Sequence, residues 1–324
     1  MRGRAERFQP STPSVPIWDS SYHSPALVNE VVELLGNSRL VLDGTLGGGG
    51  HSAALLDAGV ARVIGVDRDP DALAAAVARL PDAAAAGRFT ALRGNHASLD
   101  ELPLAGIHFD GILLDLGISS HQIDDATRGF SFREGAPLDM RMARDAARSA
   151  ADVLNDADEA ALTDMFRDNG DEPRAGRLAR EIVRRRGTRP FVSSDDLVGA
   201  IRGALGPRSG ASEFARLFQA VRIAVNEELS GLALALPALR ERLAPGGVMA
   251  ILSYHSGEDR LVKHAFRAWS AACTCPPRLP MCACGGDHAL GTVITRRAIV
   301  ASAGEVMHNA RARSARLRAW RKAE

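Results

Sequence analysis

Apolar residues recur with two different periods in the first 120 positions of the chain. Segments with helical spacing lie at 24–35, 50–59 and 71–80. Between and after them come short apolar runs of the kind found in buried strands, at 39–44, 61–69, 89–95 and 109–117. Strands that alternate with short helices indicate parallel βαβ units, so we predict an α/β fold with a doubly wound, mostly parallel sheet.

The pattern changes in the middle of the chain. Between about 138 and 215 we expect only helices, with acidic residues gathered at 152–172 and arginines at 174–189. Charge runs of this kind usually lie on solvated helix faces. Strand character returns at 246–256, 291–302 and 314–321. These changes predict a leader at 1–20, a main domain at 21–136 and 216–324, and an inserted all-helical subdomain at 137–215.

Composition and charge limit the compartments and binding partners that we expect. The 324 residues carry a net charge of +1, so binding to nucleic acid or to an anionic membrane needs local patches. The leader is basic and rich in Pro and Ser without the apolar run of a signal peptide, and we expect it to be disordered. No run of 18 apolar residues occurs, so we expect a cytoplasmic protein without membrane partners.

Glycines follow the first predicted strand in "LVLDGTLGGGGHS". Residues 48–53 fit the fingerprint G-x-G-x-x-A, and Asp67 ends the second strand at the distance expected of a ribose-binding acid. NAD and S-adenosylmethionine proteins share this signal, and a structural turn is the alternative. Asp43 favours a cofactor with a cationic amino group, because its carboxylate would crowd a pyrophosphate.

The fourth predicted strand, "DGILLDLGISSHQID", leads into Asp115. In a parallel sheet this carboxylate lies beside the glycines of the first strand, at the edge where such sheets bind ligands. The alternative role for Asp115 is a helix cap.

With these motifs the chain resembles the bacterial 16S rRNA (cytosine-N4) methyltransferase H family of MraW type. The matching segments include "HSPALVNEVVELL", "DGTLGGGGHS", "IGVDRDPDAL", "FDGILLDLGISSHQIDDATRGFSFREGAPLDMRM", "FQAVRIAVNEEL", "LAPGGVMAILSYHSGEDRLVK" and "NARARSARLR". The resemblance implies a class I methyltransferase fold with a helical insertion, S-adenosylmethionine as methyl donor, and a cytidine of 16S rRNA in the small subunit or its precursor as acceptor. DNA is not an expected partner. It also implies cofactor contacts from Gly49, Gly50, His51, Asp67, His96, Asp115 and Gln122.

The chain departs from the family pattern at four places. His96 stands where Phe is usual, His121 where Pro is usual, and Gly257 where Leu is usual. Ser212 and Glu213 begin a segment that usually starts with His-Pro. These departures leave open a paralogue with another RNA target.

The acceptor chemistry suggests catalytic candidates. The cytosine amine shares its lone pair with the ring, so a hydrogen-bond acceptor aimed at its protons would increase its nucleophilicity. Asp115 is our first candidate, with Ser119 as a helper. His255 is a candidate proton relay, or else a satisfied histidine at a strand end.

Candidate RNA contacts lie in "RGFSFREGAPLDMRM". Phe130 and Phe132 are expected to stack on bases, with strand core as the alternative. Arg128, Arg133 and Arg141 are expected to contact phosphates.

All four cysteines fall in "CTCPPRLPMCAC". Cys273, Cys275, Cys282 and Cys284 form a candidate structural zinc site, with free thiols or a redox pair as alternatives. Two other functions also stay open at this point: an NAD-dependent oxidoreductase, and a non-catalytic RNA-binding protein on a methyltransferase scaffold.

Overall fold

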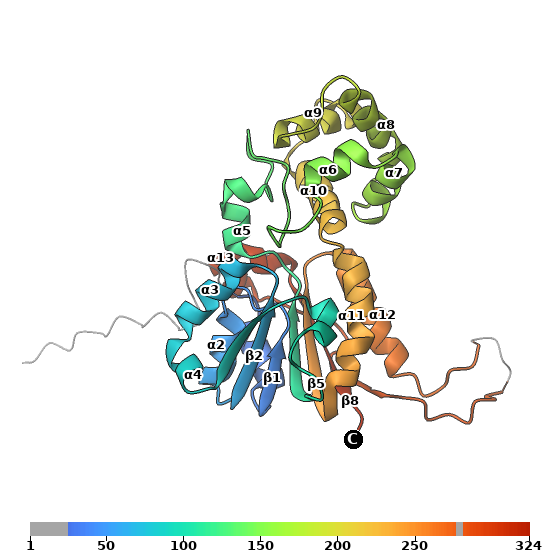
Figure 1. Ribbon diagram of the computed structural model, residues 1–324. Helices are drawn as coiled ribbons and strands as arrows, with labels where there is room; N and C mark the ends of the chain where they lie inside the picture. The colour runs from blue at the N-terminus through green and yellow to red at the C-terminus, as the bar shows by residue number, and fades with distance from the viewer. Residues whose placement is uncertain (1–24, 277–280) are drawn as a thin grey trace, which may run out of the picture.

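The computed structural model describes residues 25–276 and 281–324, and the predicted leader lies outside this range. The described chain has two parts (Figure 1): a sheet flanked by helices, and a group of helices, α6 to α10, above the end of the sheet where α5 and α11 begin.

The sheet has eight strands, and seven of them follow the order β3-β2-β1-β4-β5-β8-β6, with β7 pairing with β8. Strands β1 to β5 pair in parallel, whereas β6, β7 and β8 pair antiparallel. This arrangement confirms the predicted doubly wound, mostly parallel sheet. The bounds are β1 Leu40–Asp43, β2 Arg62–Asp67, β3 Phe89–Arg93, β4 Phe109–Asp115, β5 Leu243–Ser253, β6 Gly291–Val293, β7 Ile299–Val300 and β8 Arg316–Lys322.

The predicted strand at 291–302 is interrupted. It forms β6 and β7, which pair with opposite ends of β8. Between them, Thr295 turns inward and its Oγ1 accepts a hydrogen bond from the Ala319 backbone N–H at 2.9 Å. That side-chain bond takes the place of a strand-to-strand bond.

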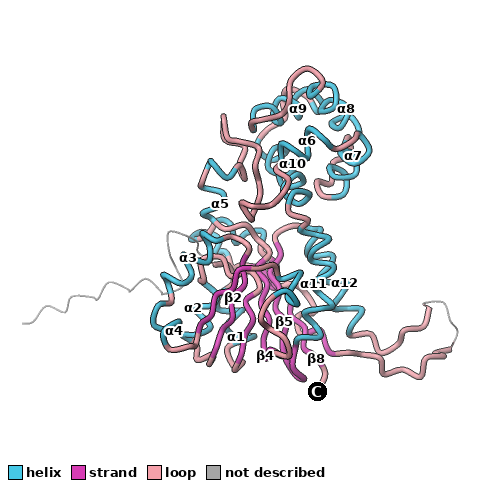
Figure 2. The backbone as a smooth tube through the Cα atoms, in the orientation of Figure 1, coloured by secondary structure: helices cyan, strands magenta, loops and turns pink. Residues whose placement is uncertain are grey.

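Apolar side chains cover both faces of the sheet, which explains the unbroken apolar runs of its strands. On one face, Val41 and Leu113 belong to a core that includes residues of α1 and α2. On the other face, their neighbours Leu42 and Leu114 belong to a core that includes residues of α11 and α12. Figure 2 shows these helices on the two sides of the strands.

The helices outside the inserted group are α1 Val28–Leu35, α2 Gly50–Asp57, α3 Pro70–Arg79, α4 Pro81–Ala85, α5 Ser120–Asp124, α11 Glu228–Arg242, α12 Ser256–Trp269 and α13 Ala303–His308. Three 3-10 helices are η1 His96–Glu101, η2 Ala126–Arg128 and η3 Ala310–Ser314. No helix in the described ranges combines the length and the apolar character that a membrane span requires.

The inserted helices have a hydrophobic core of their own. They are α6 Ala150–Asp156, α7 Glu159–Asp168, α8 Ala175–Arg186, α9 Ser194–Leu205 and α10 Ala211–Val225. Their core includes Phe130 on the N-terminal side and Val221 on the C-terminal side. The observed core therefore extends beyond the predicted range 137–215 on both sides, because Phe130 packs into it and α10 continues to Val225.

Candidate functional site

A cavity of about 320 Å³ lies at the carboxyl ends of β1, β2 and β4. Its walls come from segments far apart in the sequence. They include residues 44–47 and 50–51 after β1, Asp67 and Arg68 after β2, His96 after β3, residues 115–119 after β4, and Tyr254 after β5. Open α/β sheets bind their ligands at this edge.

The glycine loop between β1 and α2 forms the floor on one side. Gly47 and Gly49 have φ values of +51° and +74°, a region that side chains disfavour. A Cβ on Gly49 would lie 3.0 Å from the Ala76 Cβ, so this glycine packs against α3 and does not line the cavity. Gly50 and His51 do line it.

Asp67 lies at the end of β2 on the cavity wall. Its Oδ2 accepts a hydrogen bond from the Gly47 N–H at 2.8 Å, and its Oδ1 accepts one from the Asp69 N–H at 2.9 Å. Burial raises the pKa of this carboxyl group above its usual value. The two backbone bonds hold the carboxylate in place and tie the glycine loop to β2.

Gln122 also lines the cavity, but its amide is already occupied. Its Oε1 accepts from the Ser119 N–H at 3.1 Å, and its Nε2 donates to Asp69 at 2.8 Å. Asp69 is fully buried and also forms an ion pair with Arg128 at 2.9 Å. The structure thus places Gln122 as a bridge between α5 and α3.

Asp115 ends β4 with its carboxylate on the cavity wall, 9% exposed. Its Oδ2 lies 3.6 Å from the His51 Nδ1, and Tyr254 lines the same cavity. Its Oδ1 is buried and has no hydrogen-bond partner among the described residues. An unsatisfied carboxylate oxygen at a cavity wall is costly unless a ligand supplies the donor.

Tyr254 keeps its proton at any working pH. Its pKa is raised well above the usual value, chiefly because the ring is buried and also because of the charge of Asp115. The hydroxyl therefore stays protonated and can donate a hydrogen bond within the cavity.

Asp43 is buried away from the cavity, and the structure corrects its expected role. The carboxylate is 1% exposed and accepts a hydrogen bond from the Ser52 hydroxyl at 2.7 Å. Burial raises its pKa to about 6. The position joins β1 to α2 and does not line the cavity, so Asp43 does not meet a cofactor amine here.

Two candidate catalytic residues act as helix caps. Ser119 Oγ accepts from the Gln122 N–H at 3.2 Å at the start of α5, although Ser119 still reaches the cavity wall. His255 caps α12, since its Nδ1 accepts from the Glu258 N–H at 3.4 Å and its Nε2 lies 3.2 Å from the Glu258 carboxylate. The His255 ring does not line the cavity, so the expected proton relay is corrected to a capping role.

The predicted RNA contacts divide into buried and exposed residues. Arg128 is 3% exposed and pairs with Asp69, and Phe130 is 9% exposed within the helical core. The expectation that these two side chains meet RNA is therefore wrong: both support the fold.

The other three candidates reach the surface. Phe132 is 37% exposed and packs edge-on against Phe214 and Phe218. The Arg133 side chain is 55% exposed, and its Nη1 donates to the Asp124 carbonyl at 2.9 Å. Arg141 is bound by both oxygens of Asp139, at 2.9 and 2.7 Å, which neutralises most of its charge locally.

The positions that depart from the family pattern fit their local surroundings. His96 lines the cavity, and burial together with the charge of Arg68 lowers its pKa to about 4, so the ring is neutral at pH 7. A Cβ on Gly257 would lie 3.2 Å from the His255 ring, so glycine permits close packing there. Glu213 caps α10 by accepting from the Gly210 N–H at 3.1 Å and from the Ser212 hydroxyl at 3.0 Å. The His121 side chain is outside the described residues.

The structure adds residues that the sequence analysis did not assign. Arg222 and Glu228 line the cavity and form a two-bond ion pair, both bonds 2.8 Å long. Asn226 lies between them and binds the backbone of the 140–142 segment, while Arg311 and Tyr254 complete the wall. All of them fall in "FQAVRIAVNEEL", "SYHS" or "NARARSARLR", the segments that carried the resemblance, which was the available signal.

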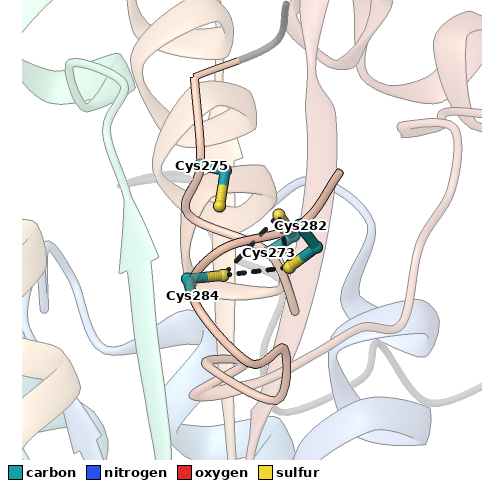
Figure 3. Close-up of side chains that lie close together, drawn as sticks. All are labelled: Cys273, Cys275, Cys282 and Cys284. Atoms are coloured by element: carbon teal, nitrogen blue, oxygen red, sulfur yellow. Dashed lines mark hydrogen bonds between the residues drawn. The ribbon is translucent and has the colours of Figure 1, made fainter. Parts of the chain in front are cut away.

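The four cysteines gather in the loop between α12 and β6 (Figure 3), and none of them lines the cavity.

Comparison with known proteins shows which family the sequence matches. The sequence model described as the MraW methylase family matches residues 20–323. Three similar proteins are each named "Ribosomal RNA small subunit methyltransferase H". The one from Gemmatimonas aurantiaca is 62% identical, over 94% of this chain and 96% of its own. Those from Heliobacterium modesticaldum and Anaeromyxobacter dehalogenans are 47% and 48% identical, over 93% of this chain and 98% and 97% of theirs.

Proposed function

The chain belongs to the MraW methylase family, and on that basis we propose that it transfers a methyl group from S-adenosylmethionine to the N4 amine of a cytidine in 16S rRNA. The observation that carries the proposal is the Asp115 carboxylate, which ends β4 with one buried oxygen unsatisfied at the cavity wall. The relatives named "Ribosomal RNA small subunit methyltransferase H" support a small-subunit rRNA substrate.

The cavity fits the proposed methyl donor. Its volume of about 320 Å³ falls in the range of small-molecule sites. Asp67, held by two backbone N–H groups, presents the carboxylate that would accept the ribose hydroxyls. The neutral ring of His96 offers a surface for packing without adding positive charge beside a sulfonium. When bound, S-adenosylmethionine supplies the activated methyl carbon.

Asp115 would act on the acceptor. Its Oδ1 can accept a proton of the cytosine amine in a hydrogen bond, which shifts lone-pair density toward the attacking nitrogen. The same charge stabilises the positive charge that develops on that nitrogen. The Tyr254 hydroxyl, which keeps its own proton, would donate to this carboxylate and orient it. Ser119, on the same wall, stays a candidate helper.

The helical part and the segment beside it would recognise the RNA. A base that enters the cavity must leave its stack, and the exposed part of the Phe132 ring offers a surface for stacking. Arg133 offers an exposed charge for a phosphate. We assign the helices α6 to α10 to recognition of the folded rRNA around the target cytidine.

Family membership favours this function over the two alternatives from the sequence. An oxidoreductase rested on the glycine fingerprint alone, which methyltransferases share. A non-catalytic RNA-binding protein would not need the unsatisfied Asp115 oxygen. A small-subunit rRNA substrate also implies that the protein acts in the cytoplasm.

The decisive variant is Asp115→Asn, which keeps the side-chain size and removes the charge. In single-turnover methyl transfer to small-subunit particles, we expect the rate constant to fall by about 10²–10³ with cofactor and RNA saturating. Asp110→Asn is the matched control. Asp110 lies on the same strand, where its Oδ2 accepts from the Arg39 and Leu40 N–H groups, and it does not line the cavity. A wild-type rate for Asp115→Asn would refute the assignment.

A further inference from the structure

The described residues between α12 and β6, 270–276 and 281–290, extend away from the body of the protein (Figure 1). Two backbone hydrogen bonds close its base: the Leu290 N–H donates to the Trp269 carbonyl at 2.7 Å, and the His288 N–H donates to the Ala272 carbonyl at 3.0 Å. Beyond that base the described side chains do not form a hydrophobic core, and Met281 is 82% exposed. Hydrophobic packing among its described residues therefore does not stabilise this segment.

The four cysteines converge in this segment. Their sulfur atoms all lie within 4.8 Å of one another (Figure 3). The Cys282 sulfur is 3.6 Å from that of Cys273 and 3.4 Å from that of Cys284, and the sulfurs of Cys273 and Cys284 are 3.7 Å apart. A zinc ion with Zn–S bonds of about 2.3 Å and tetrahedral geometry places its sulfurs about 3.8 Å apart. The three separations among Cys273, Cys282 and Cys284 are close to the edge length of such a tetrahedron, and the Cys275 sulfur lies within 4.8 Å of the other three.

Neither disulfide bonding nor burial accounts for this cluster. A disulfide requires an S–S distance of about 2.05 Å, and all four cysteines are free thiols. Burial does not gather them either, because Cys273 and Cys282 are exposed and the other two are half-buried. Exposed thiols have no hydrophobic reason to meet.

The surroundings also suit thiolate ligands. The Ala283 N–H donates to the Cys275 sulfur at 3.3 Å, which stabilises a negative charge there. The His288 Nε2 lies 2.9 Å from the Cys284 carbonyl oxygen, so this ring contacts the backbone of a ligand and leaves the four sulfurs as the ligand set.

We propose that Cys273, Cys275, Cys282 and Cys284 bind one structural zinc ion. Each thiol loses its proton to solvent as its sulfur joins the metal, so binding releases four protons and changes no oxidation state. Four sulfur ligands close the coordination sphere and leave no position for water, which makes the site structural and not catalytic. The metal replaces the hydrophobic core that the segment lacks.

The test uses the full-length protein purified without added metal or chelator. Elemental analysis is expected to find about one zinc per chain. A thiol reagent should react slowly with the native protein and should titrate four thiols once a chelator is present. Cobalt added to the stripped protein should give the charge-transfer absorption of cobalt–thiolate bonds.

Two variants distinguish the loss of a zinc ligand from a general disturbance of the segment. Cys282→Ser should lose the zinc, whereas Met281→Ser, at the adjacent exposed position, should keep it. Both should bind S-adenosylmethionine with wild-type affinity, which also reports that the body is folded. The proposal is overturned by four freely reactive thiols with only traces of metal, by iron with labile sulfide in place of zinc, or by full zinc retention in Cys282→Ser.

Discussion

The variant Arg128→Met tests whether the Arg128 guanidinium supports the fold or contacts RNA. The guanidinium is 3% exposed and lies 2.9 Å from the Asp69 carboxylate, which is fully buried. Its Nη2 also donates to the carbonyls of Arg141 and Met142, at 3.2 and 2.9 Å. Arg128 therefore ties the segment that leads to the inserted helices to the start of α3. We expect Arg128→Met to act on stability.

The size of the stability loss depends on the buried Asp69 carboxylate, which the substitution leaves without its cation. Methionine fills most of the space, but among the described residues the Asp69 carboxylate then keeps the Gln122 amide and the Asp71 N–H as its donors. Removing one partner of a buried ion pair costs about 3–5 kcal/mol, because the remaining charge stays buried without compensation. The carbonyls of Arg141 and Met142 also lose a donor, and this range already includes that loss. We expect the free energy of unfolding to fall by about 3–5 kcal/mol.

Urea denaturation followed by circular dichroism measures this change. Arg133→Met is the matched control, because its side chain is 55% exposed and its partner Asp124 is 60% exposed. Breaking such a surface pair should cost less than about 1 kcal/mol. The double variant Asp69→Asn with Arg128→Met should lose less stability than the sum of the two single variants, since the uncompensated charge is then absent.

The second measurement on these variants is their affinity for small-subunit particles at two salt concentrations. Arg133→Met should weaken RNA binding and reduce its salt dependence, whereas folded Arg128→Met should bind as the wild type does. The reasoning fails if the free energy of unfolding of Arg128→Met lies within about 1 kcal/mol of the wild-type value while its RNA affinity and the salt dependence of binding fall. That pattern would mean that the guanidinium contacts RNA.

Three further changes test other parts of the site. Asp67→Ala should weaken S-adenosylmethionine binding by roughly 1.5–3 kcal/mol in calorimetry, through lost charge-assisted hydrogen bonds, and unchanged affinity in the folded variant would remove Asp67 from the site. Tyr254→Phe removes the hydroxyl that would orient Asp115 and should lower the single-turnover rate about tenfold with cofactor affinity retained; a wild-type rate would show that the hydroxyl is dispensable. Burial raises the pKa of Asp43 from 3.8 to about 6, so the folded state holds more protons than the unfolded state between these values, and the free energy of unfolding should fall as pH rises through them, by up to roughly 3 kcal/mol. Asp43→Asn should flatten that decline in urea titrations at several pH values, and an unchanged slope would assign it to another group.

The sequence alone determined the sheet and the edge where the cavity lies. Strands such as β1 and β4 are apolar on both faces, which leaves an unbroken run that a helix pattern does not match. Parallel strands bring their carboxyl ends to one edge, so Asp67 and Asp115 had to lie near each other. These inferences needed only local periodicity and the connection rules of parallel sheets.

Only the tertiary structure decided which polar and aromatic side chains stay free. Arg128 and Arg133 lie five positions apart and have the same chemistry, yet one is buried on Asp69 and the other reaches solvent. In the same segment Phe130 enters the helical core while Phe132 keeps an exposed edge.

The ion pair between Arg128 and Asp69 was decided in the same way. In each case the outcome depends on where the chain folds and on which groups it meets there. Asp69 precedes Arg128 by 59 positions and meets it only after α3 and η2 have packed together. A local sequence pattern shows which residue types lie near one another along the chain. Burial and ion pairing arise from contacts between segments that are far apart in the sequence.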